Sequence, residues 1–221
     1  MFKVLIYSDF YMPTLALIVC MALWKQIRKS EWVIFLYCLL NTLIFSTADI
    51  LTLRHTHNTP LFHVNSLIEL WLLSFYILKK VTGKSFSLIF WVISIGYTGF
   101  FIFNVLALEP FSVFNSNSAG LESLILLFLS MYYLLALSKS DEILHFQALP
   151  SFWIISGFLI YNAVSILVLL SYKYFTYINL PKDGDNLWGV LSVAIIVKFV
   201  LISTGLLCHK KRQTTHLPFL L

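Results

Sequence analysis

The sequence predicts an all-α membrane protein: a single seven-helix transmembrane bundle over residues 1–221, with the N-terminus outside and the C-terminus in the cytoplasm. Three observations predict it. Hydrophobic residues make up 59% of the chain and charged residues only 11%, whereas a soluble domain carries about 25% charged residues. Several apolar windows are long enough to cross a bilayer. The basic residues are divided unequally between the two sets of connections.

A transmembrane helix needs about 20 predominantly apolar residues. Short connections join the windows that meet this need, so one domain is expected, with no soluble domain inserted. The seven windows run approximately over residues 4–24, 32–53, 62–78, 86–108, 120–138, 152–172 and 187–208.

The first window differs from a cleaved signal peptide, because its basic residues follow the apolar run and no small-residue cleavage site precedes Trp24. It is expected to remain as a helix inserted with its N-terminus outward. The third window is the shortest and contains Glu69, yet Pro60 before it and Lys79 after it mark its ends. The last window is expected to start at Asn186, after a turn formed by PKDGDN.

The remaining spans are predicted from the length and apolar character of their windows and, for two of them, from tryptophans at the window ends. The second window opens on Trp32, and the sixth has Trp153 near its start. Tryptophan is enriched where a helix leaves the membrane, which supports these limits. The fourth and fifth windows qualify on length and apolar character.

The basic residues predict the orientation, because cytoplasmic loops of membrane proteins carry an excess of lysine and arginine. Taken alternately, one set of connections holds ten basic residues and the other holds four. The first set comprises Lys25, Arg28, Lys29, Lys79, Lys80, Lys84, Lys139, Lys210, Lys211 and Arg212, and the second comprises Lys3, Arg54, Lys173 and Lys182. The first set is expected in the cytoplasm, and the chain in the plasma (inner) membrane.

Charge and cysteine usage narrow the possible functions. The net charge of +5 is not expected to serve nucleic-acid binding, because the basic residues are spread over the cytoplasmic edges, where anionic headgroups explain them. The lipid bilayer is the expected partner. Cys20, Cys38 and Cys208 lie in or beside spans and predict neither a disulfide framework nor a metal cluster.

Ionisable residues at membrane depth are the first candidates for a site. Each costs about 2.5–3.5 kcal/mol on insertion scales, so it normally faces the bundle interior and has a partner. Lys198 lies near the midplane of the last window, roughly 16 Å from its start at about 1.5 Å per residue. Glu69 and Glu122 lie in the outer halves of the third and fifth windows.

We expect Lys198 to pair with Glu69, Glu122 or both. One lysine with two glutamates leaves one acidic group uncompensated, which can bind a cationic ligand group or exchange a proton. The alternative is a purely structural pair that holds the helices together without a ligand.

Polar side chains at helical spacing extend this candidate site. Asn65, Glu69 and Tyr76 fall on one stripe of the third window, at i, i+4 and i+11. Asn41 and Asn162 add amides in the middle of the second and sixth windows. Together these residues predict a polar core that is open toward the outer half of the bundle.

The connection RHTHNTPLFH carries His55, His57 and His63. These histidines are candidate metal ligands, together with Glu69 or Asp49. Their spacing matches no specific ligand motif. The alternatives are that His63 caps the third helix or tunes the pocket with pH.

Two families with cofactors share features of this pattern. Retinal proteins are similar in having seven spans and a lysine midway along the last, but Ala194 stands four residues before Lys198 in place of an acid. The superfamily of alkaline ceramidases and progestin receptors shares the topology, but its histidine pair is missing from the last span, because His209 and His216 follow that span. We therefore expect neither retinal nor zinc as a cofactor.

Three segments, LFHVNSLIELWLLSFYILKK, NSAGLESLILLFLSMYYL and NLWGVLSVAIIVKFVL, resemble a group of small bacterial seven-span proteins of about this length. The resemblance covers the whole chain. It implies that Glu69, Glu122 and Lys198 form one recurring constellation, and it implies no activity.

The sequence contains no phosphate-binding loop, nucleophile elbow or HExxH motif, so we lean away from an enzyme. The expected function is a receptor-like or sensory membrane module that binds a small molecule or lipid in an outward-facing polar pocket and signals to a cytoplasmic partner protein. A small proton-coupled transporter is the alternative, and an intramembrane metal-dependent hydrolase is the third. Oligomer formation stays possible.

Overall fold

The computed structural model describes residues 8–27, 31–81, 86–139, 146–177 and 181–214. The regular structure within these ranges is helical. The helices are α2 (Ser8–Ala22), α3 (Trp24–Ile27), α4 (Trp32–Leu53), α5 (Thr59–Val81), α6 (Phe86–Ala107), α7 (Ser116–Ser138), α8 (Pro150–Tyr177) and α9 (Pro181–Thr214). Residues 4–7 of the expected first span, and Lys3, Arg28, Lys29, Lys84 and His216, lie outside the described residues.

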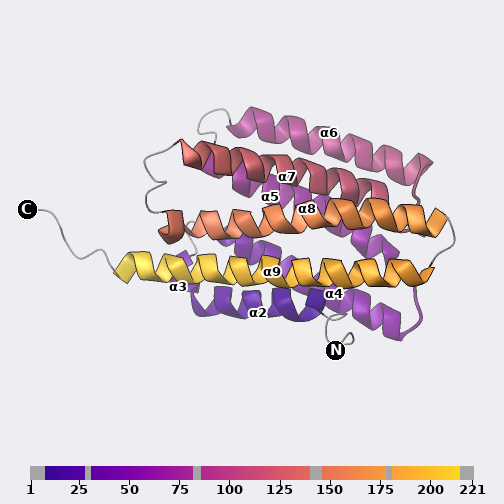
Figure 1. The fold of residues 1–221 in the computed structure, drawn as a ribbon, viewed down its shortest axis with the longest axis horizontal. Coiled ribbons are helices and arrows are strands. Elements are labelled where there is room, and N and C mark those ends of the chain that lie inside the picture. Colours follow the sequence, from indigo (N-terminus) through magenta and orange to yellow (C-terminus); the bar gives the residue numbers. More distant parts are fainter. Residues whose placement is uncertain (1–7, 28–30, 82–85, 140–145, 178–180, 215–221) are drawn as a thin grey trace, which may run out of the picture.

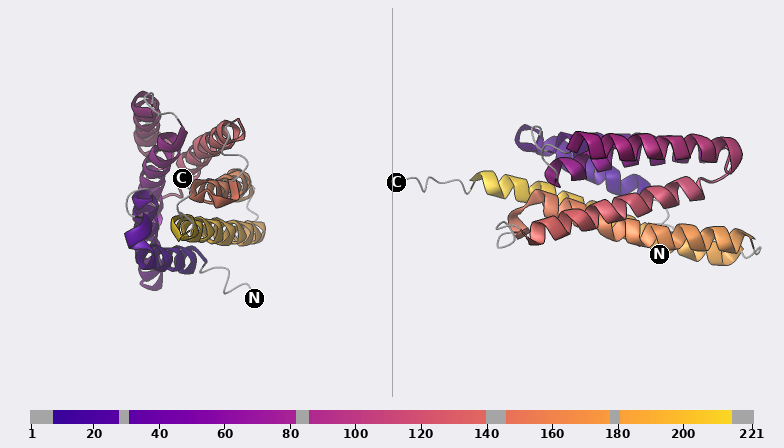
Figure 2. Two further views of the ribbon diagram at one scale, coloured as in Figure 1. Left: turned by 90° about the vertical axis from the view of Figure 1, so that its left-hand side faces the viewer. Right: turned by 90° about the horizontal axis from the view of Figure 1, so that it is seen from above.

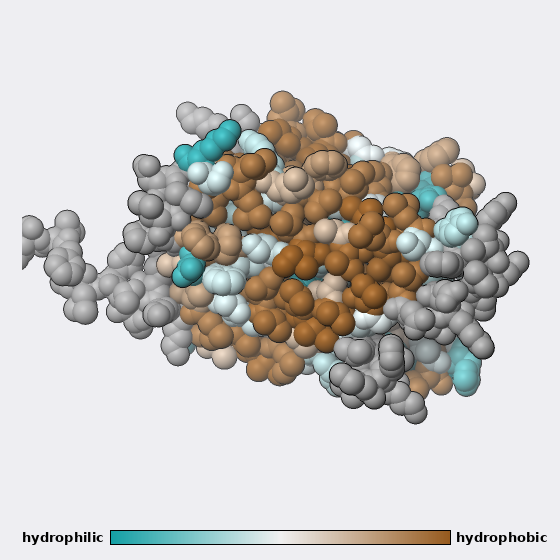
Figure 3. Space-filling model, in the orientation of Figure 1, coloured by the Kyte–Doolittle hydropathy of each residue, from teal (hydrophilic) through white to brown (hydrophobic). Residues whose placement is uncertain are grey.

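Six of these helices, α4 to α9, are long and apolar enough to cross a membrane. The structure therefore confirms the all-helical, multi-pass membrane class. Helix α2 is shorter, with 15 residues, which at about 1.5 Å per residue span about 22 Å. Many large apolar side chains are exposed, and Figure 3 shows them over the middle of one face, with hydrophilic residues toward both ends.

The helices form a ring with one helix outside it. Contacts run from α2 to α4, α5, α7, α8 and α9 in turn, and α9 contacts α2 again, which closes the ring. Helix α6 packs against α5 and α7 from outside. The helices run side by side in Figure 1, and the end view in Figure 2 shows α6, α5 and α4 in one row and α7, α8 and α9 in a second.

Two glycines allow α8 and α9 to pack closely. A Cβ atom at Gly157 would lie 2.9 Å from the backbone oxygen of Lys198, and one at Gly205 would lie 2.6 Å from the backbone oxygen of Pro150. At Gly96 on α6, by contrast, a Cβ atom would meet open space. Gly157 thus holds the backbone of Lys198 close to α8, which fixes where the lysine side chain enters the ring.

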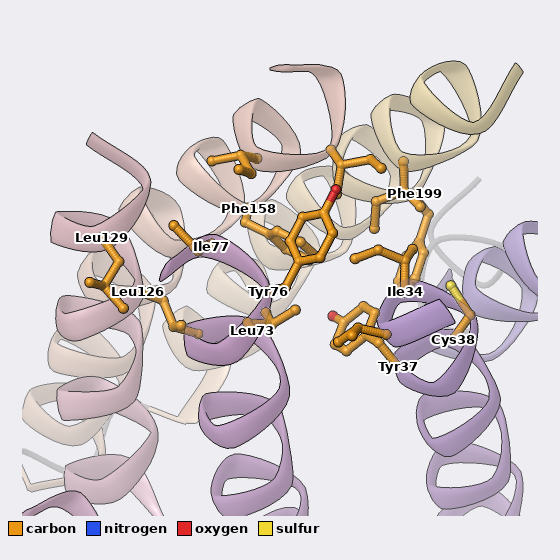
Figure 4. Close-up of a cluster of buried hydrophobic side chains, with 14 of the residues drawn as sticks. Ile34, Tyr37, Cys38, Leu73, Tyr76, Ile77, Leu126, Leu129, Phe158 and Phe199 are labelled. Carbon is orange, nitrogen blue, oxygen red and sulfur yellow. The ribbon is translucent and has the colours of Figure 1, made fainter. Parts of the chain in front are cut away.

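Aromatic rings fill the ring interior beside Lys198. Tyr37 of α4 meets Phe158 of α8 edge to face, with centroids 5.4 Å apart, and stacks on Phe199 of α9 at 6.1 Å. All three side chains are buried, and Figure 4 shows them among aliphatic residues of α4, α5 and α7. In a bilayer such contacts stabilise the fold by van der Waals packing, because lipid tails are as apolar as the side chains.

Several helices begin earlier than the apolar windows predict. Helix α5 begins at Thr59 and α7 at Ser116, because small polar residues suit the first turn of a helix although they lower its hydropathy. Helix α9 begins at Pro181, so the expected turn over PKDGDN and the start at Asn186 are wrong. Proline is favoured in the first helical turn.

Candidate functional site

A cavity of about 390 Å³ lies inside the ring. It occupies the half of the bundle in which α4 ends and α5 begins. Every helix of the ring lines it: Asp9 from α2, Phe45 from α4, Glu69 from α5, Glu122 from α7, Tyr161 from α8 and Ile195 from α9. An occupant that fills this cavity would therefore touch all six ring helices.

Lys198 joins three ring helices beneath the cavity. Its Nζ donates to the Tyr37 hydroxyl at 2.9 Å, and that hydroxyl donates to Glu69 Oε1 at 2.9 Å. The ammonium lies 3.7 Å from the same carboxylate oxygen. Asn65 Nδ2 donates to the other oxygen, Glu69 Oε2, at 3.2 Å. This chain of contacts, the Lys198–Tyr37–Glu69 latch, connects α9, α4 and α5.

The latch also explains how an ammonium group is held in an apolar interior. Lys198 Nζ lies 3.5 Å from the ring centroid of Tyr161 and 5.0 Å from that of Phe199. The negative face of an aromatic ring attracts a cation, by about 2 kcal/mol where the pair is shielded from water. Lys198 is thus enclosed by a carboxylate, a hydroxyl and aromatic faces, and its side chain is 3% exposed.

Glu122 of α7 also lines the cavity. Its carboxyl group lies beside Ser66 and within electrostatic range of Glu69 and Lys198. The neighbouring Asn115, just before α7, donates from Nδ2 to the Phe62 backbone oxygen at 3.0 Å. These contacts hold the start of α7 against α5, so that Glu122 faces the cavity.

A polar network positions the segment that leads into α7. Asn104 Nδ2 donates to Glu109 Oε2 at 3.2 Å and to Ser118 Oγ at 3.0 Å. The backbone N–H of Asn117 donates to the same Glu109 oxygen at 2.8 Å. Glu109 is a buried acid that the sequence reasoning did not single out, and its contacts give it a structural role.

The remaining expected polar residues do not all reach the cavity. Asn41 and Asn162 donate from Nδ2 to carbonyl oxygens one turn earlier on their own helices, those of Tyr37 and Phe158. Asn41 still borders a small hollow beside Lys198. Tyr76 lies nearer the other end of α5, where Lys80 Nζ is 5.3 Å from its ring centroid. The three residues of the expected stripe on α5 are therefore all buried. Asn65 and Glu69 line the cavity, whereas Tyr76 does not.

The three candidate metal-binding histidines are not brought together. His55 lies just after α4 in the left-handed region, with φ 56°. The N–H groups of His55 and Thr56 donate to the carbonyls of Thr52 and Leu51, which is a Schellman motif. His57 is exposed on the same connection. In the described residues, no group of three His, Cys, Asp or Glu side chains is arranged to hold a metal ion.

His63 lies apart from the other two histidines, inside the bundle. Its Nε2 is 2.9 Å from the backbone oxygen of Val113, and its ring lies edge-on to Phe111, with centroids 5.2 Å apart. His63 is buried at 0% exposure. Its contacts join α5 to the connection before α7, a structural role that its place in the sequence did not indicate.

Three residues near the site were missed from the sequence. Tyr37 and Tyr161 were not singled out, because a tyrosine in an apolar window indicates an interface or a core as readily as a site. The spacing of Tyr37 from Asn41, one helical turn, is the signal that was available. Asp9 lies near the start of the first window, where a carboxyl suggests only a helix end, yet it lines the cavity.

The chain matches no protein-family model, no curated protein and no solved structure. The chemistry of the cavity is therefore inferred from the residues that line it. Three carboxyl groups line it, and one ammonium group lies next to it. The arrangement can bind a ligand of matching charge, exchange protons through the carboxyl groups, or connect helix positions through the latch.

Proposed function

We propose that the protein is a receptor-like membrane module that binds a small molecule in the ring cavity and passes the binding event to a cytoplasmic partner. One observation carries this proposal: all six ring helices line a single cavity. A ligand shifts a conformational equilibrium only by its difference in affinity between the two states. The affinity of a ligand that touches every helix of a closed ring depends on the spacing of those helices.

The proposal includes an outward-facing cavity. In this proposal the chain crosses the membrane seven times, with α2 as the first crossing and the N-terminus outside. The end of the bundle that carries His57 is then outside, and the end that carries Lys79 is in the cytoplasm. The excess of basic residues near the second end supports this orientation. The cavity lies in the half of the bundle that includes His57.

Cysteine labelling tests this orientation. His57→Cys in intact cells should react with a membrane-impermeant maleimide, and Lys79→Cys should react only after the cells are permeabilised. Both positions are exposed, so accessibility to the reagent depends on the side of the membrane. The reverse pattern would place the cavity toward the cytoplasm and contradict the proposed direction of signalling.

A tethered occupant tests the signalling part while the natural ligand is still unidentified. Ser123→Cys places a thiol on the cavity wall, and benzyl methanethiosulfonate attaches a neutral ring there. We expect amide hydrogen exchange at the cytoplasmic ends of α5 and α7 to change by about tenfold, because a shift of about 1.4 kcal/mol in local opening has that effect. The measurement is exchange mass spectrometry in lipid nanodiscs.

The matched control is Leu124→Cys, the next residue on α7, whose side chain is 39% exposed on the outside of the bundle. Its modification should leave exchange at those helix ends unchanged. Two results would contradict the proposal: a Ser123→Cys thiol that does not react, or one that reacts without any change at the far ends.

The latch favours a second candidate, a small proton-coupled transporter. Lys198 and Glu69 form a buried ion pair directly below the cavity, and intramembrane ion pairs of this kind occur in proton relays. Substrate flux into proteoliposomes, driven by a pH gradient, would favour transport over signalling.

A further inference from the structure

The cavity carries more acidic groups than basic ones. Among the described side chains that border the cavity or the hollow beneath it, Asp9, Glu69 and Glu122 are acidic and Lys198 is the single basic residue. Lys198 already contacts Glu69 and Tyr37. Glu122 is within electrostatic range of Lys198, but among the described residues neither Glu122 nor Asp9 forms a salt bridge of its own.

The excess of acidic over basic groups favours an occupant with a positive charge. A carboxylate in an apolar environment is costly unless a positive charge pairs with it or it takes up a proton. An anionic ligand would face three carboxyl groups, and the one ammonium group already pairs with one of them, Glu69. A positively charged group would instead compensate Glu122 or Asp9.

Asn65 adds a hydrogen-bond acceptor to the same wall. It lines the cavity and is 9% exposed, and its Oδ1 has no hydrogen-bond partner among the described residues. The amide is oriented by Glu69, because the opposite orientation would turn Oδ1 toward the Glu69 carboxylate. Buried acceptors are normally paired, so Asn65 requires a donor, and an N–H group of an ammonium supplies one.

Aromatic rings form the rest of the wall. Phe45, Phe62, Phe114 and Trp188 all line the cavity, and we name them the aromatic collar. Neighbouring rings touch in sequence, with centroids 6.1 Å apart for Phe45 and Phe62, 6.0 Å for Phe62 and Phe114, and 5.4 Å for Phe114 and Trp188. The collar draws on α4, α5, the connection before α7, and α9. It offers apolar contact and negative ring faces to a cation.

The size and spacing of these groups distinguish an organic cation from a metal ion. The carboxyl groups are spread around the cavity and do not form a metal-ligand group among the described residues. The cavity of about 390 Å³ is far larger than the roughly 30 Å³ share of one water molecule. A bare ion would leave most of this volume and the whole collar without contact.

We propose that the cavity binds a small protonated amine with an apolar body. The ammonium group lies at Glu122 and Asn65, and the apolar body lies against the aromatic collar. This inference rests on the proposed function, because it names the ligand class of the same cavity. It requires no contribution from α6, which lies outside the ring.

Calorimetric titration of the full chain in lipid nanodiscs tests the charge and shape. The probe is 2-phenylethylammonium, and the comparison compounds are the neutral 2-phenylethanol and the anionic 3-phenylpropanoate. We expect the ammonium compound to bind at least about tenfold more tightly than the alcohol, because hydrogen bonds to ionised groups are about twice as strong as neutral ones. The anion should not bind measurably.

Two substitutions locate the ammonium group. Glu122→Gln keeps the size of the side chain and removes its charge, and it should weaken binding of 2-phenylethylammonium about tenfold or more. Glu31→Gln is the matched control, because Glu31 is also a buried acid but pairs with Lys80 at the other end of the bundle, at 2.9 Å. The control should bind as the wild type does.

The outcomes separate this inference from the proposed function. Equal binding of the alcohol and the ammonium compound, or of wild type and Glu122→Gln, would overturn the amine inference. So would tighter binding of the anion, or no binding of any of the three compounds. The tethered ring at Ser123→Cys is neutral, so its effect on the far helix ends tests the proposed function independently of charge.

Discussion

Replacing Lys198 with methionine should destabilise the protein by about 3–5 kcal/mol, the usual cost of removing one partner from a buried ion pair. Methionine retains the length of the side chain but cannot donate the hydrogen bond that the Tyr37 hydroxyl accepts from Lys198 Nζ. Glu69 then remains as a buried carboxylate, 6% exposed in its side chain, with no cation within reach among the described residues. Unfolding by sodium dodecyl sulfate in mixed micelles measures the change in free energy.

The double variant Lys198→Met with Glu69→Gln is the control for this prediction. It removes both charges and keeps an acceptor for the Tyr37 hydroxyl, so it should recover most of the lost stability. If the single variant were as stable as the wild type, the latch would not hold the three helices together. If the double variant were no better than the single one, the loss would come from packing and not from the unpaired charge.

Replacing Gly157 with leucine should destabilise the bundle by about 3 kcal/mol, the upper end of the usual cost of overpacking. The first atom of the new side chain would lie 2.9 Å from the Lys198 backbone oxygen and 3.2 Å from the Leu201 Cβ. Backbone atoms cannot move aside as a flexible side chain does, so α9 must shift away from α8. The thermal midpoint and the stability toward detergent should both fall.

Gly96→Leu is the matched control on α6, where nothing lies within 4 Å of the new Cβ atom. This variant should be neutral, or stabilising by up to about 1 kcal/mol, because leucine favours a helix more than glycine does. An equal loss for both variants would mean that glycine acts through backbone flexibility. A stable Gly157→Leu variant would contradict the close packing of α8 on α9.

Much of the fold was predictable because hydropathy is a local property. The apolar windows over 32–53 and 86–108 correspond closely to α4 and α6. The helix starts were less predictable, as Thr59 and Pro181 show, because polar residues in a first turn are outside any apolar window. The first window corresponds to the shorter helix α2, Ser8–Ala22, so length alone does not establish that crossing.

The candidate site was predictable in part. Glu69, Glu122 and Lys198 are conspicuous because an ionisable residue in an apolar run needs a partner. Tyr37 and Tyr161 are inconspicuous, because their side chains suit a lipid interface, a core or a site equally well. Asn65, which lines the cavity, shares a helical stripe with Glu69, whereas nothing in the sequence indicated that Asn162 donates to its own helix.

The sequence by itself determined that this chain is helical, that it lies in a membrane, and which charged residues must be shielded from lipid. Hydropathy and charge are sums over short segments, so a window moved along the sequence detects these properties. Only the tertiary structure decided that α6 lies outside the ring, that Lys198 reaches Tyr37, and that four aromatic rings from distant segments line one cavity. Lys198 and Tyr37 are 161 positions apart in the sequence, and such a contact depends on the rotation and neighbours of whole helices, which no local window contains.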